Sequence, residues 1–176
     1  PDNLDIQNKK IILRLDLNVP LKDKIIQDDT RIALCLPFIK RLVEKKAKII
    51  VISHLGRPKG EDQEFSLRHL VEEIEKTLGL KVNFVSQSVG EKASKAANEI
   101  RPKEVLLLEN LRFHSEETSG DENFAKRLAS HADCYVNDAF GTAHRAHAST
   151  AVIAKYFSNK KFAGHLLLKE VSSIKR

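Results

Sequence analysis

The feature that most constrains this chain is a series of six short apolar runs, separated by segments with helical periodicity. We expect a strand at each run, over residues 11–19, 48–53, 82–85, 105–108, 134–136 and 162–166. The second run is continuous in isoleucine and valine, which is typical of a parallel strand covered on both faces. Strands and helices in alternation predict right-handed crossovers and one parallel sheet. The predicted fold class is therefore α/β: a Rossmann-like three-layer sandwich, with a six-stranded parallel sheet and helices on both faces.

The helical segments carry their own start and stop signals. Thr30 can cap a first helix, whose apolar stripe is formed by Ile32, Leu36, Ile39 and Val43. Pro37 within this segment predicts a kink or a later start. Ser66 is expected to cap a second helix and Gly79 to end it. Further helical stretches are expected near residues 91–100, 122–129 and 150–157.

The sequence of 176 residues contains no internal repeat, low-complexity tract or linker that would divide it. We therefore expect residues 1–176 to form a single domain, long enough to bury a core without disulfides or a structural metal. Beyond Leu166 an amphipathic pattern runs to Arg176 without a cap or a stop signal, which indicates that the chain is cut there.

The formal net charge of +6 predicts an anionic partner and leaves open a nucleic acid, an anionic membrane or a small phosphorylated acid. No apolar run approaches the roughly 20 residues of a membrane span, and the polar N-terminal residues do not resemble a secretory signal. Aromatic residues make up 6% of the chain and none lies among the basic loops, which argues against nucleic-acid binding. Cys35 and Cys134 lie in apolar stretches and are expected to be reduced core thiols of a cytosolic protein.

Polar residues that packing does not explain gather where the predicted strands end. They are Asp16 and Asn18, then His54 and Arg57, then Asn110 and Arg112, then Asn137 and Asp138. A later loop adds His144, Arg145 and His147, and Arg31 begins the first helix. Because ligands of an open parallel sheet bind beyond the carboxyl ends of its strands, we expect one edge to hold Arg31, Arg57, Arg112 and Arg145 together with His54 and His144. Guanidinium groups match carboxylate and phosphate oxygens, so this edge predicts an anion site.

Several basic and polar residues also have plainer interpretations. A lone loop arginine is more often solvated or ion-paired at the surface, and we adopt this interpretation for Arg14, Arg41, Arg68, Arg101 and Arg127. For Asp16, an ion pair with Arg14 is an alternative to a role in the anion site. His144 and His147 offer a metal too few ligands, so no metal site is predicted. Neither G-x-x-x-x-G-K nor G-x-G-x-x-G occurs, so both common glycine-rich phosphate cradles are missing from this sequence.

Five motifs, in one order, resemble the phosphoglycerate kinase family. They are RLDLNVP at residues 14–20, DTRI at 29–32, SHLGRP at 53–58, LENLRF at 108–113 and NDAFGTAHRAHAS at 137–149. The resemblance implies a glycolytic enzyme that moves a phosphoryl group reversibly between 1,3-bisphosphoglycerate and ADP, giving 3-phosphoglycerate and ATP. It implies two domains joined by a hinge. Residues 1–176 would be the N-terminal substrate-binding domain, and a C-terminal domain absent from this chain would hold ATP or ADP with Mg²⁺.

The resemblance also assigns roles residue by residue. It puts into the phosphoglycerate site Asp16, Leu17, Asn18, Arg31, His54, Leu55, Gly56, Arg57, Arg112 and Arg145. Arg31 is further expected to touch the phosphoryl group in flight, which makes it the catalytic residue. No residue of this chain is assigned to a nucleotide or a metal, so the chain alone is expected to be inactive. The whole protein is expected to be a cytoplasmic monomer with small-molecule substrates and without nucleic-acid or membrane partners.

The charge of His54 is a separate prediction. The residue adjoins Arg57 and should face an oxygen-rich ligand, so we expect it to be a charged imidazolium when that ligand is bound. A neutral ring that donates one hydrogen bond is the alternative. Two alternatives to the enzyme also stay open: a stand-alone module that senses or stores a phosphorylated acid, and a basic nucleic-acid binder.

Overall fold

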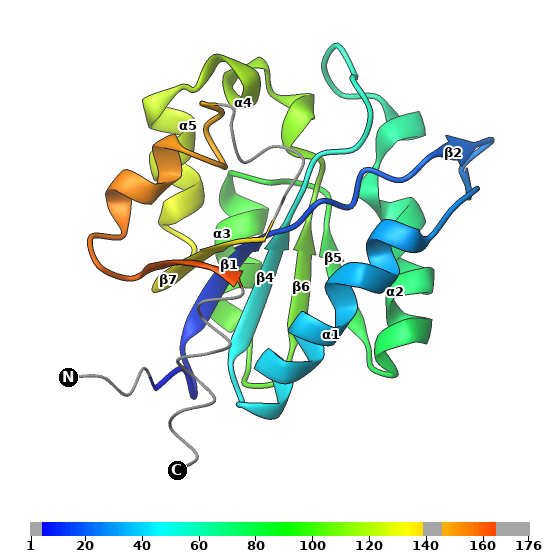
Figure 1. Cartoon of the computed structure of the whole chain (residues 1–176). Coiled ribbons are helices and arrows are strands. Elements are labelled where there is room, and N and C mark those ends of the chain that lie inside the picture. Colours follow the sequence, from blue (N-terminus) through cyan, green and yellow to red (C-terminus); the bar gives the residue numbers. More distant parts are fainter. Residues whose placement is uncertain (1–4, 139–145, 165–176) are drawn as a thin grey trace.

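The computed structural model describes residues 5–138 and 146–164, built around a six-stranded parallel sheet (Figure 1). The strands are β1 (Lys10–Arg14), β4 (Lys48–Ile52), β5 (Val82–Val85), β6 (Val105–Leu108), β7 (Cys134–Asn137) and β8 (Lys161–Ala163). Their order in the sheet is β5-β6-β4-β1-β7-β8, and each neighbouring pair is parallel. The predicted α/β class and its parallel sheet are confirmed.

Helices cover both faces of this sheet and enclose two separate cores. The helices α1 (Thr30–Glu44) and α2 (Val71–Leu78) pack on one face, and α3 (Glu91–Glu99) and α5 (Glu122–Ala129) on the other (Figure 1). Within β1, Ile11 and Leu13 enter the first core and Ile12 enters the second, because successive strand residues point to opposite faces. Each such buried side chain contributes roughly 1.5–3 kcal/mol of hydrophobic stabilisation, so β1 is anchored from both sides.

Short elements connect the main ones. A hairpin of β2 (Leu21–Lys22) and β3 (Ile25–Ile26) precedes α1, and α4 (Ser115–Ser119) precedes α5. The 3₁₀ turns are η1 (Gln63–Phe65), η2 (Leu67–Leu70), η3 (Leu111–Phe113) and η5 (Val152–Tyr156). The last of these stands in the helical stretch predicted for residues 150–157. Within residues 5–138 and 146–164, no helix is both long and apolar enough to cross a bilayer.

The predicted helix boundaries hold in part. Ser66 Oγ accepts a backbone amide hydrogen bond (3.1 Å) at the turn that leads into α2, and Gly79 ends α2 with a φ of 71°. α1 continues through Pro37, so the later start predicted from this proline is wrong. Thr30 is the first helical residue and the cap position belongs to Asp29, so the predicted cap is wrong by one residue. The Thr30 amide donates to Asp28 Oδ1 (2.9 Å).

The strand β1 is shorter than predicted, because the chain leaves the sheet after Arg14. The Leu15 amide still donates to the Ile52 carbonyl of β4 (3.0 Å), but the Val19 amide then donates to the Leu17 carbonyl (2.8 Å) in a tight turn. The three apolar side chains of this segment remain buried in the first core. The alternation in residues 15–19 therefore marks a buried loop, and this loop carries the first polar residues of the predicted site.

Candidate functional site

Side-chain amides tie together the loops that follow β1, β4 and β6, at the carboxyl edge of the sheet. Asn18 Oδ1 accepts from the Gly56 amide (2.8 Å), which joins the β1 loop to the β4 loop. Asn110 Oδ1 accepts from the Leu55 amide (3.2 Å) and Asn110 Nδ2 donates to the Leu55 carbonyl (2.8 Å), which joins the β4 loop to the β6 loop. The structure thus brings onto one edge, called here the basic edge, the residues Asp16, Asn18, Arg31, His54, Arg57 and Arg112.

The β4 loop contributes its backbone rather than its apolar side chains. Leu55 is buried, while Gly56 adopts a φ of 64° and offers its carbonyl to Arg112 Nη1 at 3.4 Å. A Cβ at Gly56 would lie 2.4 Å from Phe65 Cδ1, so a side chain cannot fit without displacing the ring. Leu17 is likewise a core residue, and its amide donates to Ser53 Oγ (3.0 Å). These positions shape the basic edge and present no functional side chain to it.

Arg31 lies at the start of α1 and reaches across to the β1 loop. Its Nη1 is 3.2 Å from Asp16 Oδ1 and donates to the Asn18 carbonyl at 2.8 Å. The Arg31 side chain remains 52% exposed, so a ligand can reach it. The ion-pair partner of Asp16 is therefore Arg31, and the alternative that paired Asp16 with Arg14 is wrong.

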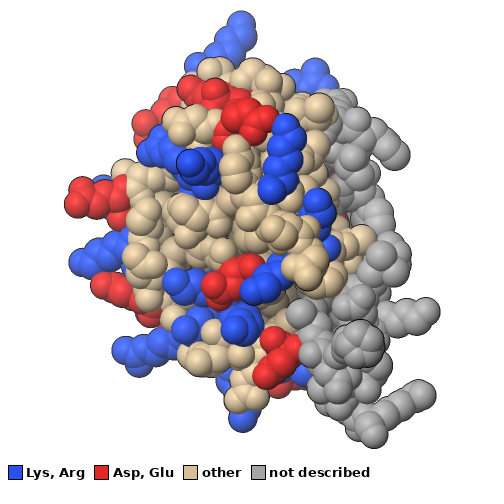
Figure 2. Space-filling view, turned by 90° about the vertical axis from the view of Figure 1, so that its left-hand side faces the viewer, with Lys and Arg blue, Asp and Glu red and all other residues tan. Residues whose placement is uncertain are grey.

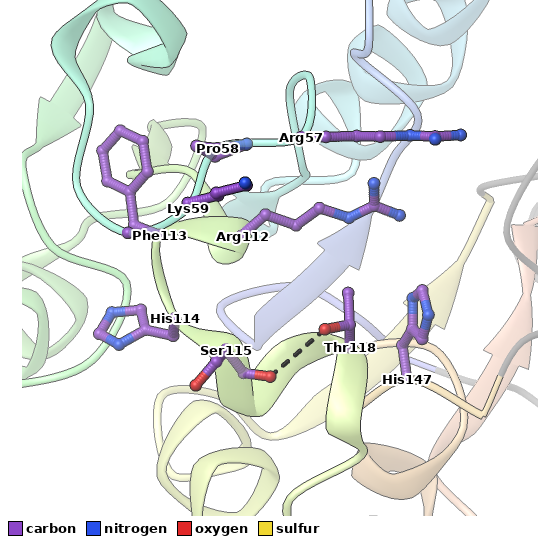
Figure 3. Close-up of a pocket in the computed structure, with 10 residues that line it drawn as sticks. Arg57, Pro58, Lys59, Arg112, Phe113, His114, Ser115, Thr118 and His147 are labelled. Carbon is purple, nitrogen blue, oxygen red and sulfur yellow. Dashed lines mark hydrogen bonds between the residues drawn. The ribbon is translucent and has the colours of Figure 1, made fainter.

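A cavity of about 750 Å³ opens beside the β4 and β6 loops (Figure 3). Its lining residues are Arg57, Pro58, Lys59, Gly60, Arg112, Phe113, His114, Ser115, Thr118 and His147. In Figure 3 the Arg57 and Arg112 side chains extend in the same direction, and His147 lies across from Arg112. The described lining includes three cationic side chains and no carboxylate, and its volume is in the usual range for small-molecule sites. Such a cavity suits a small anion.

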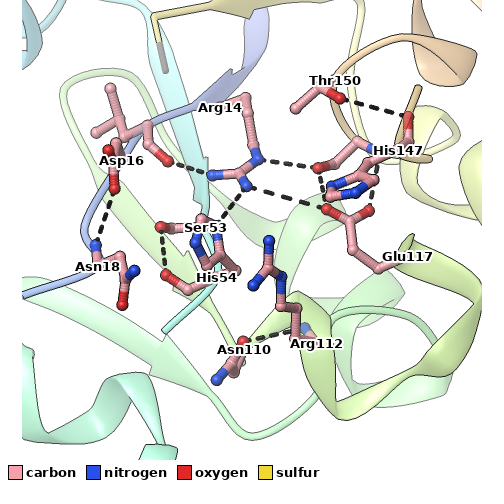
Figure 4. Close-up of polar contacts among 12 residues, drawn as sticks. Arg14, Asp16, Asn18, Ser53, His54, Asn110, Arg112, Glu117, His147 and Thr150 are labelled. Carbon is pink, nitrogen blue, oxygen red and sulfur yellow. Dashed lines mark hydrogen bonds and ion pairs between the residues drawn. The ribbon is translucent and has the colours of Figure 1, made fainter. Parts of the chain in front are cut away.

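Arg14 is completely buried beneath the basic edge, contrary to the prediction of a solvated side chain (Figure 4). Its Nε donates to Ser149 Oγ (2.9 Å), its Nη1 to the Leu15 carbonyl and its Nη2 to His54 Nδ1 (2.8 Å). Nη2 also lies 4.0 Å from Glu117 Oε2. The prediction failed because Arg14 follows Leu13 in a strand covered on both faces, where even a polar residue points into a core.

Glu117 of α4 is a second buried charge, and the sequence analysis missed it. Its carboxylate accepts from the Ser149 amide (2.9 Å) and from Ser149 Oγ, while its backbone carbonyl accepts from the Ala148 amide (2.9 Å). Glu117 therefore fixes the segment that follows the histidine-rich loop against α4. Its local sequence resembles an exposed helix, so only the distant contact with Ser149 reveals its role.

His54 is buried and neutral in this structure. Burial, followed by the positive charges of Arg14 and Arg112, lowers the pKa of His54 to about 2. Arg14 also donates to the ring nitrogen Nδ1, which needs a free lone pair there. The charged imidazolium was predicted for the ligand-bound state and stays a prediction, whereas this structure favours the neutral ring given as the alternative.

Comparison with known proteins identifies the family. The family model described as "Phosphoglycerate kinase" matches residues 2–176. The chain belongs to the phosphoglycerate kinase family. All five motifs around the basic edge fall within the matched residues.

Relatives of known sequence and structure agree with this assignment. The cytosolic phosphoglycerate kinase of Triticum aestivum is 53% identical over 95% of this chain, and the phosphoglycerate kinase of Dictyoglomus turgidum is 47% identical over 95%. The solved phosphoglycerate kinase of Coxiella burnetii matches 99% of this chain with 39% identity and a TM-score of 0.83. That of Pyrococcus horikoshii matches 98% with 33% identity and a TM-score of 0.83. The chain spans 42% of the length of the two sequence relatives, and 43% and 44% of the two structures.

Some positions that the phosphoglycerate kinase motifs cover cannot be described. Arg145 and His144 lie outside the described residues, so the structure tests neither prediction. Asn137 and Asp138 follow the predicted fifth strand, and Asn137 Nδ2 donates to the Thr150 carbonyl (3.5 Å). His147 lines the cavity of the basic edge, although the sequence predicted no specific role for it there.

Proposed function

We propose that this chain is the phosphoglycerate-binding part of a phosphoglycerate kinase, and that the basic edge holds 3-phosphoglycerate and 1,3-bisphosphoglycerate. The whole enzyme would transfer a phosphoryl group reversibly between 1,3-bisphosphoglycerate and ADP. The observation that carries this proposal is the cavity that Arg57, Lys59 and Arg112 line together. None of the described residues that line it is an Asp or a Glu. Both substrates present a phosphate and a second acidic group, which guanidinium forks bind in two-point fashion.

Within this proposal Arg31 is the catalytic residue. Phosphoryl transfer proceeds through a loose transition state, so the protein mainly positions groups and neutralises charge on the migrating phosphoryl. Arg31 is half exposed and is held by Asp16 and the Asn18 carbonyl, so it presents a preoriented cation at the rim of the basic edge. A preorganised donor of this kind acts on charge that develops only in the transition state.

We assign ATP or ADP with Mg²⁺ to a C-terminal domain that this chain does not contain. The length of the curated relatives, of which this chain spans 42%, supports the assignment.

We further propose that the whole protein is a cytoplasmic monomer that binds only small molecules. The buried and unbridged thiols of Cys35 and Cys134 favour a reducing compartment, and one relative is named as a cytosolic enzyme. Figure 2 views the left-hand side of Figure 1, where described Lys and Arg side chains lie among Asp and Glu rather than in a continuous basic stripe. This mixture disfavours a nucleic-acid surface on the face that Figure 2 shows, because such a surface needs clustered positive charge.

Titration calorimetry of this chain with 3-phosphoglycerate and, separately, with ATP tests the proposal. We expect the acid to bind, with an affinity that falls as salt rises, and ATP to bind far more weakly. An Arg57→Ala, Arg112→Ala double variant should lose the acid, whereas Arg41→Ala on the far part of α1 should retain it. Equal affinities for ATP and the acid would contradict the assignment.

A further inference from the structure

A fully buried ion pair lies beneath the basic edge and is connected to His54 (Figure 4). Arg14 and Glu117 are both 0% exposed, with Arg14 Nη2 4.0 Å from Glu117 Oε2. Burying two charges is unfavourable unless hydrogen bonds satisfy them. Here Ser149 supplies those bonds from the middle of the pair, because its Oγ accepts from Arg14 Nε (2.9 Å) and donates to Glu117 Oε2.

The third contact of Arg14 determines which nitrogen of His54 carries the proton. A guanidinium has only donors, so the 2.8 Å contact between Arg14 Nη2 and His54 Nδ1 requires a lone pair on Nδ1. The ring proton of the neutral imidazole must then sit on Nε2. A proton on Nδ1 would place two N–H groups against each other in a site without exposure to water.

The surroundings of His54 keep this ring neutral from every side. Burial is the largest cause of the lowered pKa of His54, and the positive charge of Arg14 is the next largest. The charges of Arg112, His147 and Arg31 lower this pKa further. The last three belong to the basic edge or its cavity, so the positive charges of the proposed substrate site also act on the His54 ring. With Nδ1 engaged by Arg14, the Nε2–H group is the donor that this ring retains for an anion.

We propose that Arg14 and Glu117 are positioning residues that fix His54 as a neutral Nε2–H donor toward the anionic substrate. Glu117 acts through Arg14, because its carboxylate and Ser149 hold the guanidinium in the orientation that reaches Nδ1. The part of this inference that concerns substrate rests on the proposed function. The part that concerns the His54 proton does not.

Two experiments on the intact protein separate these parts. Nitrogen-15 NMR of labelled histidines, without ligand at neutral pH, should give His54 a pyridine-type Nδ1 and a pyrrole-type Nε2. In Arg14→Lys, which keeps the charge but loses the fork, we expect a mixture of both tautomers. Glu117→Gln, which removes the charge but keeps an oxygen for the Ser149 amide, should shift the ring in the same direction. The control Arg68→Lys, on a side chain that stacks over Phe84, should leave the His54 signals unchanged.

Calorimetric titration with 3-phosphoglycerate then tests the role of the tautomer. We expect Arg14→Lys to bind the acid roughly tenfold more weakly than the parent, the scale of one charge-assisted hydrogen bond. An imidazolium or an Nδ1–H ring in the parent would overturn the inference without any variant, as would unchanged His54 signals in both variants. An altered tautomer with unchanged affinity would overturn the positioning role. A parent protein that does not bind the acid at all would contradict the proposed function, while the histidine spectrum would still decide the inference about the proton.

Discussion

The Arg31 guanidinium lies 3.2 Å from the Asp16 carboxylate, although Asp16 is only two residues from Arg14 in sequence. The two arginines therefore have different roles. Arg14 is buried and bonds to interior side chains, whereas Arg31 is half exposed and is the residue that we propose meets the ligand.

In the full-length enzyme, Arg31→Ala should lower kcat by about a hundredfold or more, as expected for one lost preorganised donor. Arg112→Ala and Arg145→Ala should chiefly raise the KM for the acid, because we propose that these residues bind parts of the substrate that change little during transfer. Single-turnover rates at saturating substrate measure the difference. If Arg31→Ala keeps nearly full kcat while its KM rises, Arg31 is a binding residue and its catalytic assignment is wrong.

Glu117→Ala should destabilise the protein by about 3–5 kcal/mol, because it leaves the buried Arg14 charge without its partner. Glu116→Ala is the matched control, since Glu116 is the adjacent residue in α4 and its side chain is 47% exposed. That variant should change stability by no more than ~0.5 kcal/mol. Urea unfolding followed by circular dichroism measures both. Similar losses in the two variants would show that burial of Glu117 does not matter to stability.

Gly56→Ala should be more destabilising than Gly79→Ala, although both glycines have nearly the same backbone conformation. Their φ angles are 64° and 71°, so alanine incurs a similar left-handed strain of about 1 kcal/mol at each. Only at Gly56 does the added Cβ meet another side chain, 2.4 Å from Phe65 Cδ1. The additional loss of stability in Gly56→Ala, measured by thermal unfolding, corresponds to this steric clash. Equal effects would mean that Phe65 moves aside freely.

The unfolding free energy should fall as pH drops below the ordinary histidine pKa of 6.5. Burial holds the folded-state pKa of His54 at about 2, so the unfolded chain binds a proton across this window and the folded chain does not. The slope from this one group approaches about 1.4 kcal/mol per pH unit. Burial lowers the pKa of His131 as well, which adds to the slope in the same direction. Stability that persists unchanged to pH 4 would refute both assignments.

Matched variants isolate the part of the slope that belongs to His54. His54→Gln should flatten the pH dependence, because glutamine does not titrate in this range. The control is His69→Gln, which removes a half-buried histidine of η2 and leaves His54 in place. Urea midpoints at several pH values compare the three proteins. A His54→Gln protein as acid-sensitive as the parent would assign the slope to other groups.

Local sequence patterns predicted the sheet but not the buried pair. The continuous apolar run of β4 indicates a strand covered on both faces, and the polar residues at strand ends indicate the basic edge, because both signals lie within a few residues. Arg14 could not be assigned in this way. Its partner Ser149 lies 135 residues further along the chain, and Glu117 sits in a short helix of polar residues. Only the approach of Ser149 and Glu117 to Arg14, from segments distant in the sequence, decides that these charges are buried.

The turn after β1 shows a second structure that the sequence pattern could not predict. Apolar and polar residues alternate over residues 15–19 in the same way whether the chain forms a strand or a loop whose alternate side chains point inward. The Val19 amide donates to the Leu17 carbonyl at 2.8 Å, and this bond takes the chain out of the sheet. The side-chain directions were predictable, and the hydrogen-bond partners were not.

The central claim, that the basic edge is the site of the phosphorylated acid, is tested most directly by amide NMR of this chain during a titration with 3-phosphoglycerate. We predict saturable shifts at the amides of Asn18, Gly56 and Arg112, which the hydrogen bonds of the basic edge hold in place. Shifts confined to the cavity between β5 and α3, at residues such as Asn83, Ala96 and Arg101, would contradict it.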